Sequence, residues 1–161
     1  MTRRLELFVA IGVVLADQIT KALVVADLGL LQSVQVIPRL LNLTHVRNSG
    51  VAFGFMNSVD FAFKPLLMAV FALGALLGVG IYAAQLPLDH RRSRVGLALI
   101  LGGAAGNLLD RARQGFVVDF VDVYWRGWHF WAFNAADAAI TVGVTVLILD
   151  LLVPPRTAPA A

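Results

Sequence analysis

The sequence predicts a polytopic membrane protein of mainly α class, with four transmembrane helices and one small β element. Of its 161 residues, 59% are hydrophobic and only 14% are charged, roughly half the charged fraction of a soluble domain. Four apolar stretches are long enough to cross a bilayer as helices. Between the first two, the hydrophobic pattern changes to an alternation that is typical of strands. The length suits a single membrane-embedded domain over residues 1–161.

The first predicted span covers about residues 5–26. Its basic start and apolar run are similar to a signal peptide, but no small-x-small cleavage site follows and the apolar pattern continues. We therefore expect an uncleaved helix. Asp17 and Lys21 lie four residues apart on one face of it, so they can form an ion pair that neutralises two buried charges.

A β element is predicted over about residues 33–57. Short alternating runs are broken there by a proline and by the turn triplet Asn48-Ser49-Gly50. One face of its last strand would be too apolar for water, so we expect it on the membrane surface or against the helices. The side chains on that face are Val51, Phe53 and Phe55.

The second predicted span covers about residues 65–86, and Pro65 suits the first position of a helix. The third covers about residues 95–112. Glycines on one face of it would let a neighbouring helix approach closely, and the amide and carboxylate beyond them are more polar than a lipid-facing surface tolerates. The residues on this face are Gly103, Gly106, Asn107 and Asp110.

The remaining segments are a predicted loop at about 113–135 and a last span at about 136–153. The loop holds all three tryptophans, which marks a membrane interface. Asp119 and Asp137 stand at either end of this aromatic segment. Because a carboxylate at the edge of a bilayer is costly, we interpret them as partners in a catalytic pair. The alternative is a solvated loop residue and an acid that merely suits a helix start.

Asp122 lies in the same segment as Asp119. In an extended chain the two side chains point to opposite faces, so one of them should be an ordinary solvated residue. The pattern alone does not say which.

The composition excludes several kinds of chemistry. The chain has no cysteine, so disulfides, thiol nucleophiles and Cys-ligated metals are excluded. The three histidines are scattered, so we expect no metal site and no cofactor. The net charge of +3 comes from arginines near helix ends, which suits anionic lipid headgroups better than nucleic acid.

Lysines and arginines are nearly equally numerous on the two sides of a four-span protein, so their count does not fix its orientation. One side, however, carries its lysines and arginines densely on short tails and one short loop. This density fixes the orientation better than the count, because the charges beside the first helix usually dominate. We expect both termini in the cytoplasm and the carboxylate pair on the outer side.

Five motifs follow one another across nearly the whole chain. They are Asp17-Gln18-x-x-Lys21, Asn48-x-Gly50-x-Ala52-Phe53-Gly54, Gly102-Gly103-x-x-Gly106-Asn107-x-x-Asp110-Arg111, Val117-Val118-Asp119-Phe120 and Phe133-Asn134-x-Ala136-Asp137. In these motifs and in their order along the chain, the sequence resembles the lipoprotein signal peptidases (signal peptidase II). The resemblance implies a multi-pass aspartyl endopeptidase of the bacterial inner membrane, with four spans, a small periplasmic β-cradle and an active site near the periplasmic face. It implies removal of signal peptides from prolipoproteins just before a diacylglyceryl-modified cysteine.

The same resemblance assigns roles to residues. It implies that Asp119 and Asp137 form the catalytic dyad and that Asp122 has no counterpart role. The residues implied to line or support the site are Asp17, Lys21, Asn48, Gly50, Asn107, Arg111 and Asn134. Lipidated prolipoproteins and membrane phospholipid are the implied partners, and we expect a monomer. Trp131 stands where relatives often have a proline, which predicts a looser start of the last helix.

Two carboxylates within a few ångströms cannot both ionise cheaply, so such a pair would share one proton and could activate a water. A small proton-coupled membrane transporter would use the same buried acids as a relay. The lack of an internal repeat and the position of both acids at one interface argue against it. A non-catalytic assembly factor would leave Asn107, Asn134 and the two aspartates without a role.

Overall fold

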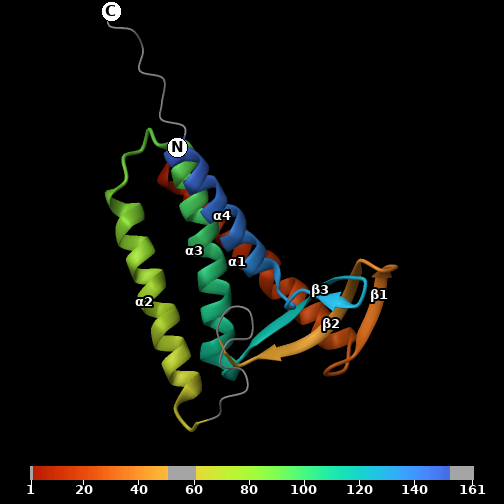
Figure 1. The fold of residues 1–161 in the computed structure, drawn as a ribbon. Helices are drawn as coiled ribbons and strands as arrows, with labels where there is room; N and C mark the ends of the chain where they lie inside the picture. Colours follow the sequence, from red (N-terminus) through yellow and green to blue (C-terminus); the bar gives the residue numbers. More distant parts are fainter. Residues whose placement is uncertain (1, 51–60, 153–161) are drawn as a thin grey trace, which may run out of the picture.

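The structure, a computed structural model, describes residues 2–50 and 61–152. Within them lie four helices and a four-stranded sheet (Figure 1). Each helix is long and apolar enough to cross a membrane, so the predicted fold class is confirmed. The elements in chain order are α1 (Arg3–Asp27), β1 (Ser33–Ile37), β2 (Leu41–Asn48), α2 (Lys64–Gln85), α3 (Arg91–Gln114), β3 (Val117–Trp125), β4 (Trp128–His129) and α4 (Ala135–Leu152).

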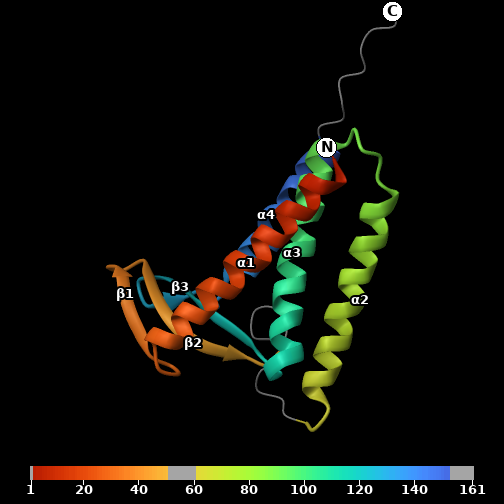
Figure 2. The ribbon, with the colours of Figure 1, turned by 180° about the vertical axis from the view of Figure 1, so that it is seen from behind.

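Helix α3 is the centre of the bundle and packs against the other three helices. Two glycines of α3 allow α4 and α1 to approach it closely. A Cβ atom on Gly103 would lie 2.4 Å from the carbonyl oxygen of Ala136 in α4, and one on Gly106 would lie 2.7 Å from Asp17 Oδ2 in α1. Any larger residue would push these helices apart. Helix α2 packs mainly on α3 and stands apart from α1 and α4 (Figures 1 and 2).

Helix α3 begins at Arg91, four residues before the start expected from apolarity alone. The reason is that Arg94 is buried inside the bundle, where its guanidinium forms an ion pair with Glu6 of α1. Neutralisation by a carboxylate lets the helix continue through a charged residue.

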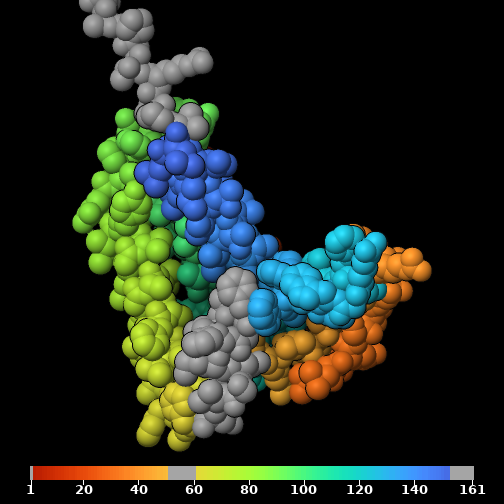
Figure 3. Space-filling view, in the orientation of Figure 1, coloured from red at the N-terminus to blue at the C-terminus, as the bar shows by residue number. Residues whose placement is uncertain are grey.

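The sheet is antiparallel, in the order β1-β2-β3-β4. It projects sideways from the helices, beside the end of α1 and the start of α4 (Figure 3). The predicted strand face formed by Val51, Phe53 and Phe55 lies outside the described residues.

The segment expected as a loop at 113–135 contains β3 and β4. Gly115 ends α3 in the left-handed conformation, at φ 78°, which glycine adopts at little cost. The chain then continues directly into β3, whose β-branched and aromatic residues suit a strand. This short connection brings Asp119 back towards the helices.

Candidate active site

Asp119 lies on β3 and Asp137 lies in the first turn of α4, and one residue contacts both carboxylates. The side-chain amide of Asn134 donates to Asp119 Oδ1 at 2.7 Å. Its backbone N–H donates to Asp137 Oδ2 at 3.3 Å. Asn134 itself is completely buried, and Asp119 is 2% exposed, whereas Asp137 is only partly buried. The structure thus brings the two predicted acids to one site and leaves Asp137 the more accessible.

The local sequence explains why Asp137 sits where it does. Asn134 directly precedes α4, and its Oδ1 accepts from the backbone N–H of Asp137 at 2.9 Å while the Asp137 carboxylate accepts from Asn134. This reciprocal pair is a capping box. Just before it, Phe133 exchanges backbone hydrogen bonds with Val121 of β3. These bonds hold the start of α4 against β3.

Burial dominates the electrostatics of Asp119. Burial, and after it the neighbouring Asp137 carboxylate, raise the pKa of this carboxyl to about 7. Hydrogen bonds oppose the shift, including one from Asn48 Nδ2 at 3.0 Å. Near neutral pH, Asp119 therefore holds a proton far more readily than an ordinary aspartate does.

Asn107 of α3 holds the other carboxylate. Its Nδ2 donates to Asp137 Oδ1 at 2.8 Å. Its Oδ1 accepts from Lys21 Nζ at 3.0 Å and from Asn134 Nδ2 at 3.2 Å. Because an ammonium group can only donate, Lys21 fixes which end of the Asn107 amide faces Asp137.

The predicted ion pair in α1 forms part of a larger buried cluster. Lys21 Nζ lies 2.7 Å from Asp17 Oδ2 and 2.7 Å from Asp110 Oδ2. The second oxygen of Asp17 accepts from the backbone N–H of Ala136 at 3.0 Å, so it satisfies a donor at the start of α4. Asp17 therefore ties α1 to the helix turn that carries Asp137.

Gln18 was not among the predicted site residues, yet it belongs to this cluster. Its Nε2 donates to Asp110 Oδ1 at 2.9 Å and to Asp17 Oδ2 at 3.2 Å. Its position next to Asp17 in the first motif was the available signal.

Arg111 and the turn after β2 form the remaining side of the site. The Arg111 guanidinium donates to the carbonyl of Asn107 at 3.2 Å and to that of Gly50 at 3.1 Å. The Gly50 N–H in turn donates to Asn48 Oδ1 at 3.0 Å. This chain of bonds positions the Asn48 amide against Asp119.

One of the two acids of β3 was expected in solvent, but neither is: Asp119 is 2% exposed and Asp122 is 9% exposed. Asn42 of β2 donates to Asp122 Oδ2 at 3.0 Å, and His129 Nδ1 lies 2.9 Å from Asp122 Oδ1. The prediction was wrong because strand pairing, which is not visible in the local pattern, covers this side chain. Its partners belong to the sheet and not to the network around Asn107 and Asn134.

Over the two described ranges, no group of three or more His, Asp or Glu side chains is placed to hold a metal ion.

Three comparisons with known proteins give concordant matches. The family profile described as Signal peptidase (SPase) II matches residues 9–153. The chain is 47% identical over 136 residues to a lipoprotein signal peptidase of Geobacter metallireducens, covering 84% of this chain and 83% of that one. It is 42% identical over 154 residues to a lipoprotein signal peptidase of Geobacter sulfurreducens, covering 94% and 93%. A solved bacterial membrane enzyme superposes with a TM-score of 0.84 at 29% identity, covering 99% of this chain and 95% of that one.

Proposed function

The chain belongs to the signal peptidase II family, and from this premise we propose that Asp119 and Asp137 are its catalytic dyad. The protein is a membrane aspartic peptidase that cleaves the signal peptides of lipoproteins. We further propose that the scissile bond directly precedes a diacylglyceryl-modified cysteine and that the enzyme acts as a monomer surrounded by phospholipid.

The observation that carries the dyad proposal is the double contact of Asn134 with both carboxylates. A single buried residue that bonds to two acids holds them at a fixed separation, which shared proton chemistry requires. The pKa of Asp119, which burial and the Asp137 carboxylate raise to about 7, supports a protonated acid at this position. Asp137 is more accessible and lies at the positive end of the α4 dipole, which suits a charged base.

In the proposed reaction, the Asp137 carboxylate removes a proton from a water as the water oxygen attacks the peptide carbonyl carbon. Protonated Asp119 gives its proton to the carbonyl oxygen, so a neutral tetrahedral diol forms. The C–N bond then breaks as the proton held by Asp137 moves to the leaving nitrogen. Asp119 recovers a proton from the diol as the new carboxyl group forms, and the dyad returns to its starting state.

The supporting residues act by position in this proposal. Asn107 holds the Asp137 carboxylate, and Lys21 orients the Asn107 amide. Asp17 fixes the turn of α4 that carries Asp137. Arg111 holds the carbonyl of Gly50, which keeps the adjoining turn beside the dyad.

We propose that the dyad faces the periplasm at the outer surface of the inner membrane and that both termini are cytoplasmic. The exposed tryptophans of the β3–β4 hairpin support an interfacial position for this end of the molecule. The N-terminus and the end of α4 lie at the opposite end of the bundle (Figure 1).

The test is cleavage of a purified prolipoprotein in detergent, with the product mapped by mass spectrometry. The expected product begins with the lipidated cysteine. A matched substrate without the diacylglyceryl group should be cleaved far more slowly. Equal cleavage of both substrates, or cleavage at another bond, would contradict the proposed specificity.

A further inference from the structure

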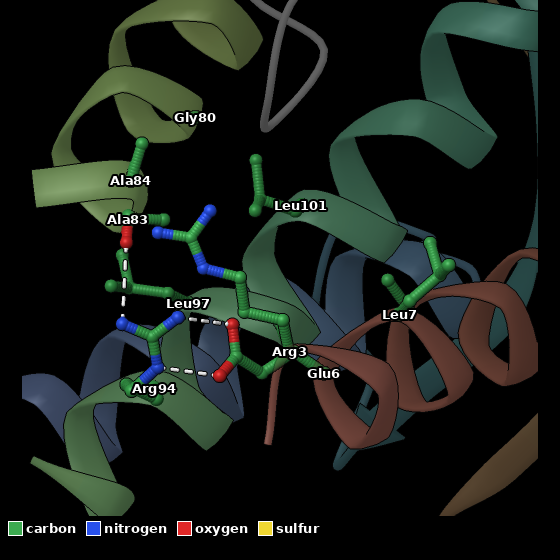
Figure 4. A pocket seen from close by; sticks show the side chains of 11 residues that line it. Arg3, Glu6, Leu7, Gly80, Ala83, Ala84, Arg94, Leu97 and Leu101 are labelled. Atoms are coloured by element: carbon green, nitrogen blue, oxygen red, sulfur yellow. Dashed lines mark hydrogen bonds and ion pairs between the residues drawn. The ribbon is translucent and has the colours of Figure 1, made fainter. Parts of the chain in front are cut away.

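A second polar site lies at the end of the bundle remote from the dyad. A pocket of about 270 Å³ opens there between α1, α2 and α3 (Figure 4). Its polar lining comes from Arg3 and Glu6 at the start of α1 and from Arg94 at the start of α3. Its apolar walls include Gly80 of α2 and Leu97 and Leu101 of α3.

All three guanidinium nitrogens of Arg94 donate hydrogen bonds within the protein at this pocket. It is 3% exposed. Its Nε and Nη2 donate to the two oxygens of Glu6 at 2.5 and 2.6 Å, a bidentate pair. Its Nη1 donates to the carbonyl of Leu86 at the end of α2. The guanidinium therefore joins three helices, and the carboxylate of Glu6 neutralises its charge.

Arg3 supplies a charge that this pair leaves unbalanced. Figure 4 draws its side chain directed into the pocket, above the Arg94–Glu6 pair. Among the described residues that line the pocket, Glu6 is the one acid, and both of its oxygens are bonded to Arg94. With two arginines and one glutamate, the described lining carries a net charge of +1. An anion with a single negative charge would balance it.

The surroundings indicate the form of that anion. The walls beneath Arg3 are apolar and belong to helices that cross the membrane, while Arg4, Arg91 and Arg92 are exposed at the same end. Cationic pockets between membrane helices at the headgroup level favour anionic lipids. The basic start of a signal peptide would instead be repelled by Arg3.

We propose that this pocket binds one anionic phospholipid, with its phosphate on Arg3 and an acyl chain against Leu97 and Leu101. Helix α2 packs mainly on α3, and such a lipid would fill the space between α1 and the end of α2. This site is separate from the dyad, and the proposal does not depend on the catalytic mechanism.

The test measures lipid binding to the full chain, purified in detergent and stripped of lipid, by native mass spectrometry. Phosphatidylglycerol, phosphatidylcholine with the same acyl chains and inorganic phosphate are the three probes. Phosphatidylglycerol should bind the unchanged protein about tenfold more tightly than phosphatidylcholine, since only the former carries a net charge. Inorganic phosphate alone should bind much more weakly than either lipid.

Two variants and a matched control locate the site. Arg3→Gln should weaken phosphatidylglycerol binding about tenfold, whereas Arg4→Gln, one residue along and outside the pocket, should leave it unchanged. Gly80→Leu keeps all the charges but fills the pocket. It should fold, because a Cβ there meets only Leu101 at 4.0 Å, and it should also weaken binding.

Four results with the three probes and the arginine variants would overturn the proposal. They are equal affinity of the Arg3→Gln variant and the unchanged protein, equal losses from the two arginine variants, equal binding of the two lipids, and binding of free phosphate as tight as that of the anionic lipid. Unchanged affinity in the Gly80→Leu variant would place the lipid elsewhere and would likewise refute the site.

Discussion

Asp119→Asn should remove a pH-dependent loss of stability that ionisation of this carboxyl causes in the wild-type protein. The pKa of Asp119 is raised from 3.8 to about 7 by burial and by the Asp137 carboxylate. The folded state therefore binds this proton more tightly than the unfolded state does. The stabilisation from the proton is complete below pH 4 and is lost as the pH rises through about 7.

The magnitude follows from these two pKa values. Between pH 5 and pH 8 the group should contribute a loss of about 2–3 kcal/mol in the free energy of unfolding. Asparagine cannot ionise, so the variant should lack this part of the pH dependence. Its absolute stability will also change, because its amide nitrogen must face a donor from Asn48 or Asn134. The quantity to compare is thus the change between the two pH values.

The assay is denaturant unfolding in one detergent at pH 5 and pH 8. Asp27→Asn is the matched control, since this acid is exposed at the end of α1. The control should follow the wild-type protein, and Asp119→Asn should lose about 2–3 kcal/mol less than both. A loss in the Asp119→Asn variant equal to that of wild type would refute the reasoning about the buried carboxyl.

Three further predictions concern the network, the reaction and the orientation. Lys21→Met should lower stability by about 3–5 kcal/mol, because it leaves two buried carboxylates without their cation; a loss below about 1 kcal/mol in denaturant unfolding would contradict this. The initial rate of cleavage should fall as the pH rises through about 7, where Asp119 loses its proton, and a rate that stays constant to strongly alkaline pH would exclude a shared proton. Single cysteines at the exposed positions Asp89 and Trp128 should be labelled by an impermeant thiol reagent from the inside and the outside of the cell, respectively, and the reverse pattern would invert the topology.

Much of the architecture could be predicted because membrane helices depend on local composition. Apolar length is sufficient to find each helix, and the glycines at 103 and 106 indicated close packing of α3. The motif resemblance brought Asp119 and Asp137 together from positions that spacing alone leaves on separate elements. Physical reasoning by itself left the choice between a catalytic pair and two ordinary acids open.

What could not be predicted depends on pairing between distant segments. One of Asp119 and Asp122 was expected in solvent, but both are buried, and strand pairing with β2 places Asn42 beside Asp122. Arg94 precedes the predicted start of the third span at about residue 95, whereas in the structure Glu6, 88 residues away, allows its burial inside α3. In both cases the partner that makes a polar residue stable inside the fold comes from another element, which a local window does not contain.

The most direct test of the dyad is the rate of cleavage by purified Asp119→Asn and Asp137→Asn on a lipidated prolipoprotein. Asp122→Asn is the control, since it removes another buried carboxylate from β3 whose partners lie outside the network of Asn107 and Asn134. Both dyad variants should remain folded and lose about 10³-fold or more in rate, while the control keeps most of its activity. A folded dyad variant that cleaves at a rate near that of the wild-type protein would contradict the catalytic assignment.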